Sequence, residues 1–275
     1  MAKSALLKSS IGKKYWMALT GLFLCTFLVG HLAGNLQLLV PNNALHFNQY
    51  ALFMTSNPAV KLLSYLTYIS IIFHAVDGIL LAIQNKKARP IAYAKNDAGA
   101  NSGFASRNMA VLGTVILVFI ATHMINFWAK MHFDEKMPLQ KITIELQQGM
   151  KNDFYVTTDG GYIPVNDPAY VIKNRVEFFD TAANVKVKEG YKDLYKITFD
   201  FFKDAKYGLA FTLFYVLAMI VLAFHLFHGF QSAFQSLGAN NPKYTPAIKL
   251  FGKLFSIVVP TLFAIIPIYI HFFSK

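Results

Sequence analysis

Five long apolar runs are the strongest constraint on how this chain folds. A helix rises about 1.5 Å per residue, so about 20 apolar residues cross the hydrocarbon core of a bilayer. The first run is too long for the apolar region of a signal peptide, and we expect it to be retained as a helix. The sequence therefore predicts an all-α integral membrane protein with five transmembrane helices, at Tyr15–Val40, Leu62–Ile83, Met109–Lys130, Leu209–Phe234 and Leu250–Phe273.

The positive charge is concentrated in short segments between these runs. The net charge is +12, but residues 134–206 hold 12 acidic and 11 basic residues, so the excess lies elsewhere. Since basic loops stay in the cytoplasm, the distribution predicts a cytoplasmic N-terminus and an extracytoplasmic C-terminus. It indicates topology and not binding of nucleic acid. The basic residues on the predicted cytoplasmic side are Lys3, Lys8, Lys13, Lys14, Lys86, Lys87, Arg89, Lys95, Arg107, Lys243, Lys249 and Lys253.

The chain divides into three parts. Residues 1–131 contain the first three transmembrane helices, residues 132–206 form an extracytoplasmic insertion, and residues 207–275 contain the last two helices. The insertion is polar. Thr158–Gly161 predicts a turn, and the strand-prone pairs Tyr155-Val156 and Tyr162-Ile163 on either side of it indicate a small β-hairpin.

Four of the five runs carry a histidine well inside the run, namely His31, His74, His123 and His225, whereas His271 lies near the end of the fifth. An imidazole at membrane depth is costly unless its polar atoms are satisfied. Hydrogen bonding to a neighbouring helix explains one such residue well, but four on four helices favour two pairs of axial haem ligands. Because bis-histidine ligation fills both axial positions of the iron, the expected chemistry is one-electron transfer.

The depths of the histidines separate them into two pairs. Counted from the expected cytoplasmic ends at 1.5 Å per residue, His31 and His123 lie about 25 Å and about 24 Å deep, whereas His74 and His225 lie about 18 Å and about 16 Å deep. Each pair joins two helices that run in the same direction, which are diagonal in an up-down four-helix bundle. Zinc, the main rival for imidazole ligands, favours three or four ligands at one depth.

Short motifs around these histidines resemble the diheme cytochrome b membrane anchor of succinate dehydrogenases and of related succinate:quinone and quinol:fumarate oxidoreductases. The resemblance covers the five helices, about 130 residues, and excludes the insertion. The matching pieces are Gly30-His31-Leu32 with Asn35, Phe73-His74-Ala75-Val76 with Gly78, Thr122-His123, and Phe224-His225 with Gly229.

The resemblance implies two haem b groups. His74 and His225 would hold the inner haem iron, and His31 and His123 the outer one. It implies that the first four transmembrane helices, I–IV in chain order, form a diheme bundle with the fifth, helix V, beside it. The implied location is a bacterial inner membrane. The implied electron partner is a quinone, with menaquinone expected. The implied protein partners are a flavoprotein subunit and an iron–sulfur subunit on the cytoplasmic side, in a complex able to oligomerise further.

Two features depart from the family. The connection between helices III and IV is usually short, but here it spans about 75 residues. Some menaquinol-oxidising relatives carry an acid two residues before the helix IV ligand, where this chain has Ala223.

Three further residues are candidates near the cofactors. His228 competes with His225 as a ligand, and otherwise bonds a haem propionate or a backbone group. Asp77, one turn from His74, is either a proton relay or a residue that reaches the cytoplasmic surface. His46, in the outer connection, is either a quinone ligand or an ordinary surface histidine.

The sequence thus predicts the electron-transfer anchor of a succinate dehydrogenase. Cys25 is the single cysteine, so no cysteine-ligated cluster is expected on this chain, and the dicarboxylate chemistry belongs to a partner. The alternatives are the cytochrome b anchor of a hydrogenase or formate dehydrogenase, and a haem-free proton-coupled transporter that uses His74, Asp77 and His225 as a relay. Transporters usually show internal repeats and broken helices. These spans show neither clearly, apart from Pro260 and Pro267 in helix V.

Overall fold

The computed structural model of the protein describes residues 9–91, 97–145 and 150–274. Lys3, Lys8 and Lys95, which belong to the predicted cytoplasmic charge pattern, lie outside these residues. The structure is mostly helical and confirms the five predicted long helices. The helical stretches long and apolar enough to cross a membrane are Ser10–Leu39, Pro58–Lys87, Met109–Phe133, Gly208–Ser236 and Thr245–Phe273.

Two of the long helices begin at recognisable capping residues. The Ser9 side chain accepts a hydrogen bond from the backbone N–H of Gly12, and Asn57 caps the next span immediately before Pro58. The third span contains a π-helical segment at Met124–Ala129, and the fifth ends in one at Tyr269–Phe273. The helices are α2 (Ser10–Asn35), α3 (Ala44–Ser56), α4 (Pro58–Lys87), α5 (Ala98–Asn101), α6 (Phe104–Arg107), α7 (Met109–His123), α8 (Lys130–Phe133), α9 (Leu194–Lys203), α10 (Gly208–Ser236) and α11 (Thr245–Ile268), with a 3-10 turn at Leu36–Leu39.

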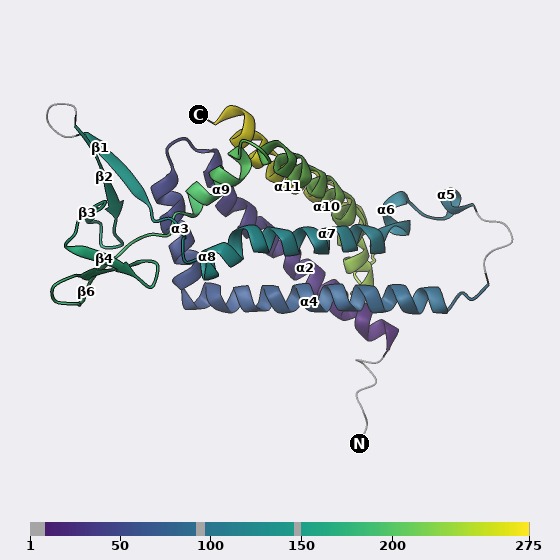
Figure 1. Ribbon diagram of the computed structural model, residues 1–275. Helices are drawn as coiled ribbons and strands as arrows, with labels where there is room; N and C mark the ends of the chain where they lie inside the picture. The colour runs from purple at the N-terminus through teal and green to yellow at the C-terminus, as the bar shows by residue number, and fades with distance from the viewer. Residues whose placement is uncertain (1–8, 92–96, 146–149, 275) are drawn as a thin grey trace, which may run out of the picture.

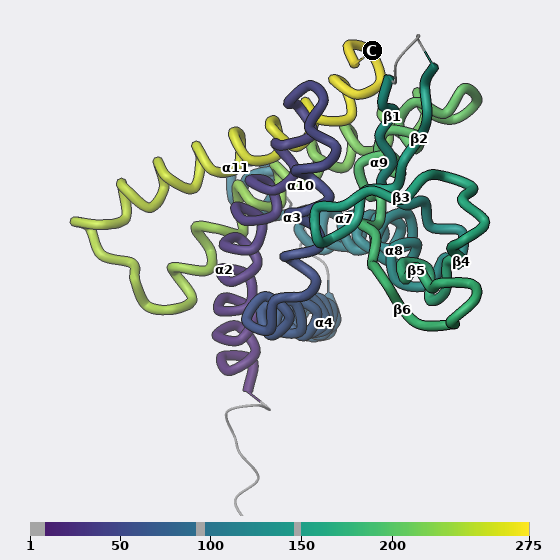
Figure 2. Tube along the Cα trace, turned by 90° about the vertical axis from the view of Figure 1, so that its left-hand side faces the viewer, coloured from purple at the N-terminus to yellow at the C-terminus, as the bar shows by residue number. Residues whose placement is uncertain are grey.

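Four of the long helices contact one another in a ring. Helix α2 packs against α4 and α10, and α7 also packs against α4 and α10, so α2 faces α7 diagonally and α4 faces α10. Helix α11 lies outside this ring, against α10 and α2 (Figures 1 and 2). Many large apolar side chains of the five helices are exposed on the outside of the assembly, as expected for helices that face lipid.

The described residues between α8 and α10, 134–145 and 150–207, form a cap at one end of the helices (Figure 1). The cap contains two antiparallel three-stranded sheets, so the prediction of an all-α chain is incomplete. The predicted hairpin is confirmed, because Tyr155 pairs with Ile163 and Val156 with Tyr162. The strands are β1 (Lys141–Glu145), β2 (Lys151–Val156) and β3 (Tyr162–Pro164) in one sheet, and β4 (Tyr170–Lys173), β5 (Glu177–Asp180) and β6 (Lys186–Glu189) in the other.

A buried polar network ties the cap to the helices. Asn48 of α3 is almost fully buried and donates hydrogen bonds to the side chains of Gln140 and Asp193. Asp193 also caps α9 by accepting from the backbone of Lys196, and α9 packs on α3, α10 and the end of the fifth span. The network holds the cap over the end of the helices that carries His31 and His123.

Candidate functional site

The structure brings His31 of α2 and His123 of α7 together across one diagonal of the ring. Their ring centroids are 5.8 Å apart, and the ring planes are nearly perpendicular at 87°. Nδ1 of His123 lies 3.4 Å from the hydroxyl of Tyr215 on α10. Nδ1 of His31 lies 3.4 Å from the side-chain amide of Asn35, which also donates to the His31 carbonyl oxygen at 2.7 Å.

His74 of α4 and His225 of α10 form a second pair across the other diagonal, with ring centroids 6.1 Å apart and an interplanar angle of 69°. Nδ1 of His74 donates to the carbonyl oxygen of Met17 at 3.1 Å, and the hydroxyl of Thr20 is 3.5 Å away. Because a carbonyl only accepts, this bond places the ring hydrogen on Nδ1 and leaves Nε2 with its lone pair. Nδ1 of His225 is buried and has no hydrogen-bond partner among the described residues.

Two glycines show how far apart the pairs lie. A Cβ atom on Gly21 of α2 would be 3.1 Å from the ring of His74, and one on Gly113 of α7 would be 3.6 Å from the ring of His225. Gly21 precedes His31 by ten residues, and Gly113 precedes His123 by ten. At 1.5 Å per residue, the pair His74–His225 therefore lies about 15 Å further from the cap than the pair His31–His123.

The residues present fit two bis-imidazole metal centres. Two imidazoles on one metal ion, with metal–nitrogen bonds of about 2.0–2.1 Å, have ring centres about 6 Å apart. Both pairs match this spacing. A Cβ atom on Gly30 or on Gly78, next to His31 and one turn from His74, would meet no atom within 4 Å, so there is room beside a ligand of each pair.

Other glycines near the histidines serve helix packing. A Cβ atom on Gly34 would be 2.7 Å from the ring of Tyr50, so this glycine lets α3 approach α2. A Cβ atom on Gly229 would be 3.3 Å from the methyl group of Met109. Gly229, four residues after His225, therefore makes room for α7 and does not border open space.

The structure brings none of the remaining candidates into either pair. His228 is half-buried on α10, and His46 is exposed on α3. Asp77 is half-buried one turn after His74. Within the described residues no hydrogen bond or ion pair of these three side chains is formed. His132 and His271 instead bond backbone carbonyl oxygens, those of Trp128 and Phe202, and have structural roles.

Sequence reasoning missed three residues of the site. Gly21 and Gly113 share one feature that the sequence shows, because each is a glycine ten residues before a paired histidine. In the structure, each of these glycines lies against a histidine of the other pair. Tyr215 has no such signal. It comes from the same helix as His225 but bonds a residue of the other pair, and only the packing of α10 against α7 reveals this contact.

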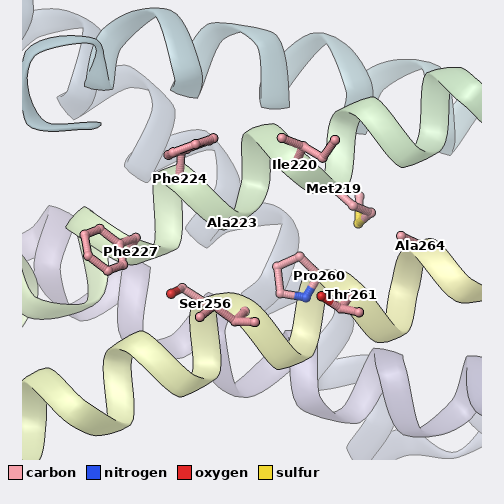
Figure 3. A pocket seen from close by; sticks show the side chains of 10 residues that line it. Met219, Ile220, Ala223, Phe224, Phe227, Ser256, Pro260, Thr261 and Ala264 are labelled. Atoms are coloured by element: carbon pink, nitrogen blue, oxygen red, sulfur yellow. The ribbon is translucent and has the colours of Figure 1, made fainter. Parts of the chain in front are cut away.

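A separate apolar groove of about 400 Å³ lies between α10 and α11 (Figure 3). Its walls include Phe224, Phe227, Pro260 and Ala264, with the polar side chains of Ser256 and Thr261. None of the four paired histidines lines it.

The fold and the site define a mostly helical chain with five helices able to cross a membrane and two histidine pairs between four of them. These helices are compatible with a multi-pass membrane protein. Comparisons with known protein families, with curated proteins and with solved structures find no match to this chain.

Proposed function

We propose that this chain is the diheme cytochrome b membrane anchor of a succinate:quinone oxidoreductase, located in a bacterial inner membrane. The observation that carries the proposal is the pairing of His31 with His123 and of His74 with His225, at two depths and across the two diagonals of one bundle. Two b-type haems, each between one pair, account for the four paired histidines. The short motifs around these residues point to the succinate dehydrogenase family.

A haem held by each histidine pair would supply reversible one-electron transfer. The chain's own residues fix the ligands. The Met17 carbonyl oxygen holds the His74 ring in the tautomer whose Nε2 is free to bind a metal, and the Tyr215 hydroxyl contacts Nδ1 of His123.

The charge distribution supports partners at the end opposite the cap. Lys86, Lys87 and Arg107 lie there, at the ends of α4 and α6, where a flavoprotein and an iron–sulfur subunit would dock on the cytoplasmic side. In this arrangement the pair His74–His225 is the nearer one to the partners. The pair His31–His123 lies beneath the cap and would exchange electrons with a quinone, for which menaquinone is the expected species.

The first experiment is a reduced-minus-oxidised spectrum of the purified protein with a pyridine haemochrome assay. We expect two low-spin b haems per chain that do not react with carbon monoxide. Well-folded protein without haem would overturn the proposal and favour a haem-free transporter.

A second experiment identifies the partner. An affinity tag on this chain should recover a flavoprotein and an iron–sulfur protein from solubilised membranes, and the complex should reduce a quinone with succinate. Recovery of a hydrogenase or formate dehydrogenase subunit would instead retain the haems and overturn the succinate assignment.

A further inference from the structure

Two cations of the cap are bonded to the last turn of the third candidate membrane span. The guanidinium of Arg175 donates to the carbonyl oxygen of His132, and the ammonium of Lys192 donates to that of Met131 at 2.6 Å. Both carbonyls belong to the end of the span Met109–Phe133. The two charges therefore lie at the level where this helix leaves the hydrocarbon core.

A pocket of about 380 Å³ opens beside Arg175. Three basic residues line it, Lys136, Lys141 and Arg175, together with one acidic residue, Glu135. Pro138 and Tyr155 contribute apolar surface, and the Lys141 ammonium lies 5.1 Å from the centre of the Tyr155 ring. We call this site the basic pocket.

The charges of the basic pocket are not neutralised within the described part of the chain. Elsewhere in the cap, Lys186, Lys188 and Lys196 form ion pairs with acidic side chains. No ion pair of Lys136, Lys141, Arg175 or Lys192 is formed among the described residues. Burial and the charge of Arg175 lower the pKa of Lys192, which indicates that positive charge is crowded here.

A purely structural role explains only half of this arrangement. Cations that bond the last carbonyls of a helix stabilise its C-terminus, and Arg175 and Lys192 fit that role at the end of α8. Among the described residues, the ammonium groups of Lys136 and Lys141 bond no helix carbonyl, and that of Lys141 lies over the Tyr155 ring. Their charges face the same pocket, and they require another explanation.

We propose that the basic pocket binds the phosphate group of an anionic phospholipid. Phospholipid phosphates lie at the end of the hydrocarbon core, and lysine and arginine bind phosphate through charge-assisted hydrogen bonds. The neighbouring side chains suit the membrane interface, because Trp128 stacks on His132 at 4.5 Å and Phe133 is 69% exposed. The proposal does not depend on haem binding.

The test compares lipid retention by the full-length purified protein. The wild type and the variant K136Q/K141Q are equilibrated with equal amounts of phosphatidylglycerol and phosphatidylcholine, and native mass spectrometry counts the bound lipids. Arg175 and Lys192 keep their bonds to α8 in this variant, so the cap should stay folded. We expect the preference for phosphatidylglycerol to fall about 30-fold, from the typical contribution of each lysine near an anionic membrane surface.

The matched control K151Q/K173Q removes two positive charges from the same cap outside the pocket and should keep the wild-type preference. Glu135→Gln removes the pocket's acidic group and should raise the preference. Equal retention in K136Q/K141Q and in the control would overturn the proposal. Competition by millimolar inorganic phosphate that abolishes retention would also overturn it, because the site would then bind a free anion and not a lipid.

Discussion

The two histidine pairs have nearly the same spacing but different surroundings. In the outer pair, the Nδ1 atoms of His31 and His123 both contact polar side chains, those of Asn35 and Tyr215. In the inner pair, Nδ1 of His74 bonds a backbone carbonyl oxygen, and Nδ1 of His225 has no partner among the described residues. The two pairs therefore do not differ in the residues that form them, but they differ in the groups that contact the Nδ1 atoms of these histidines.

This difference has a chemical consequence. A hydrogen bond from Nδ1 of a metal-bound histidine increases the electron donation of the ring and stabilises the oxidised metal. The Tyr215 hydroxyl can accept such a bond from Nδ1 of His123 and can be replaced singly, whereas a backbone carbonyl cannot. In the proposed diheme arrangement, the outer centre would thus be adjustable by mutation of Tyr215, and the inner centre would be fixed mainly by the helix backbone.

Removal of a ligand should have the largest effect and should separate the pairs completely. We expect His74→Ala or His225→Ala to remove the inner haem, and His31→Ala or His123→Ala to remove the outer one, so that each variant keeps half of the haem. The measurement is the haemochrome content together with a low-temperature spectrum. His132→Gln, outside both pairs, should keep both haems. Loss of one and the same spectral component in all four variants would contradict the pairing.

A substitution that fills space beside one pair should have the next largest effect. A leucine at Gly30 meets no protein atom at its Cβ position within 4 Å, so the protein alone should tolerate it. If a porphyrin occupies that space, overpacking costs about 1–3 kcal/mol, which lowers the affinity for the outer haem by about 5- to 150-fold.

The haem ratio measured during titration with haemin tests this expectation. Val29→Leu adds bulk at the neighbouring position, which is 51% exposed, and should leave both haems in place. Full outer-haem occupancy in Gly30→Leu would show that no cofactor edge lies there.

The sequence predicts the parts of this architecture that depend on length and order along one helix. Hydropathy locates the five long helices, and counting residues groups His31 with His123 and His74 with His225. The contacts of Tyr215, Gly21 and Gly113 depend instead on which face of one helix meets another. The rotation of each helix about its own axis is set by packing. Because nearly every position in an apolar span is apolar, the sequence pattern carries little information about which face is buried.

The cap shows the same limit. The local residues at Thr158–Gly161 predict a turn and its hairpin, and that prediction is confirmed. The helix α3 and the amphipathic helix α9 were not predicted, and they are held by the buried side chains of Asn48, Gln140 and Asp193, which are far apart in the sequence. Polar residues in a loop-like segment gave no sign that they would meet in a buried network.

Removal of the hydroxyl from Tyr215 should shift the potential of the outer haem alone. In Tyr215→Phe, Nδ1 of His123 loses its acceptor, so the ring donates less and the midpoint potential rises. A net hydrogen bond of about 0.5–1.5 kcal/mol corresponds to at most about 20–60 mV for a one-electron couple. Redox titration followed by the spectrum of each haem measures the shift. A shift of the inner haem instead would reverse the assignment of the two pairs.

The smallest effect is expected from Thr20→Val at the inner pair. The Thr20 hydroxyl lies 3.5 Å from Nδ1 of His74, but that atom also donates to the Met17 carbonyl oxygen at 3.1 Å. Because the shorter backbone bond remains, the inner potential should change by less than the roughly 20 mV at the lower limit of one hydrogen bond. Redox titration under the conditions used for Tyr215→Phe provides the comparison. A larger shift for Thr20→Val than for Tyr215→Phe would show that side chains, and not the backbone, control the inner centre.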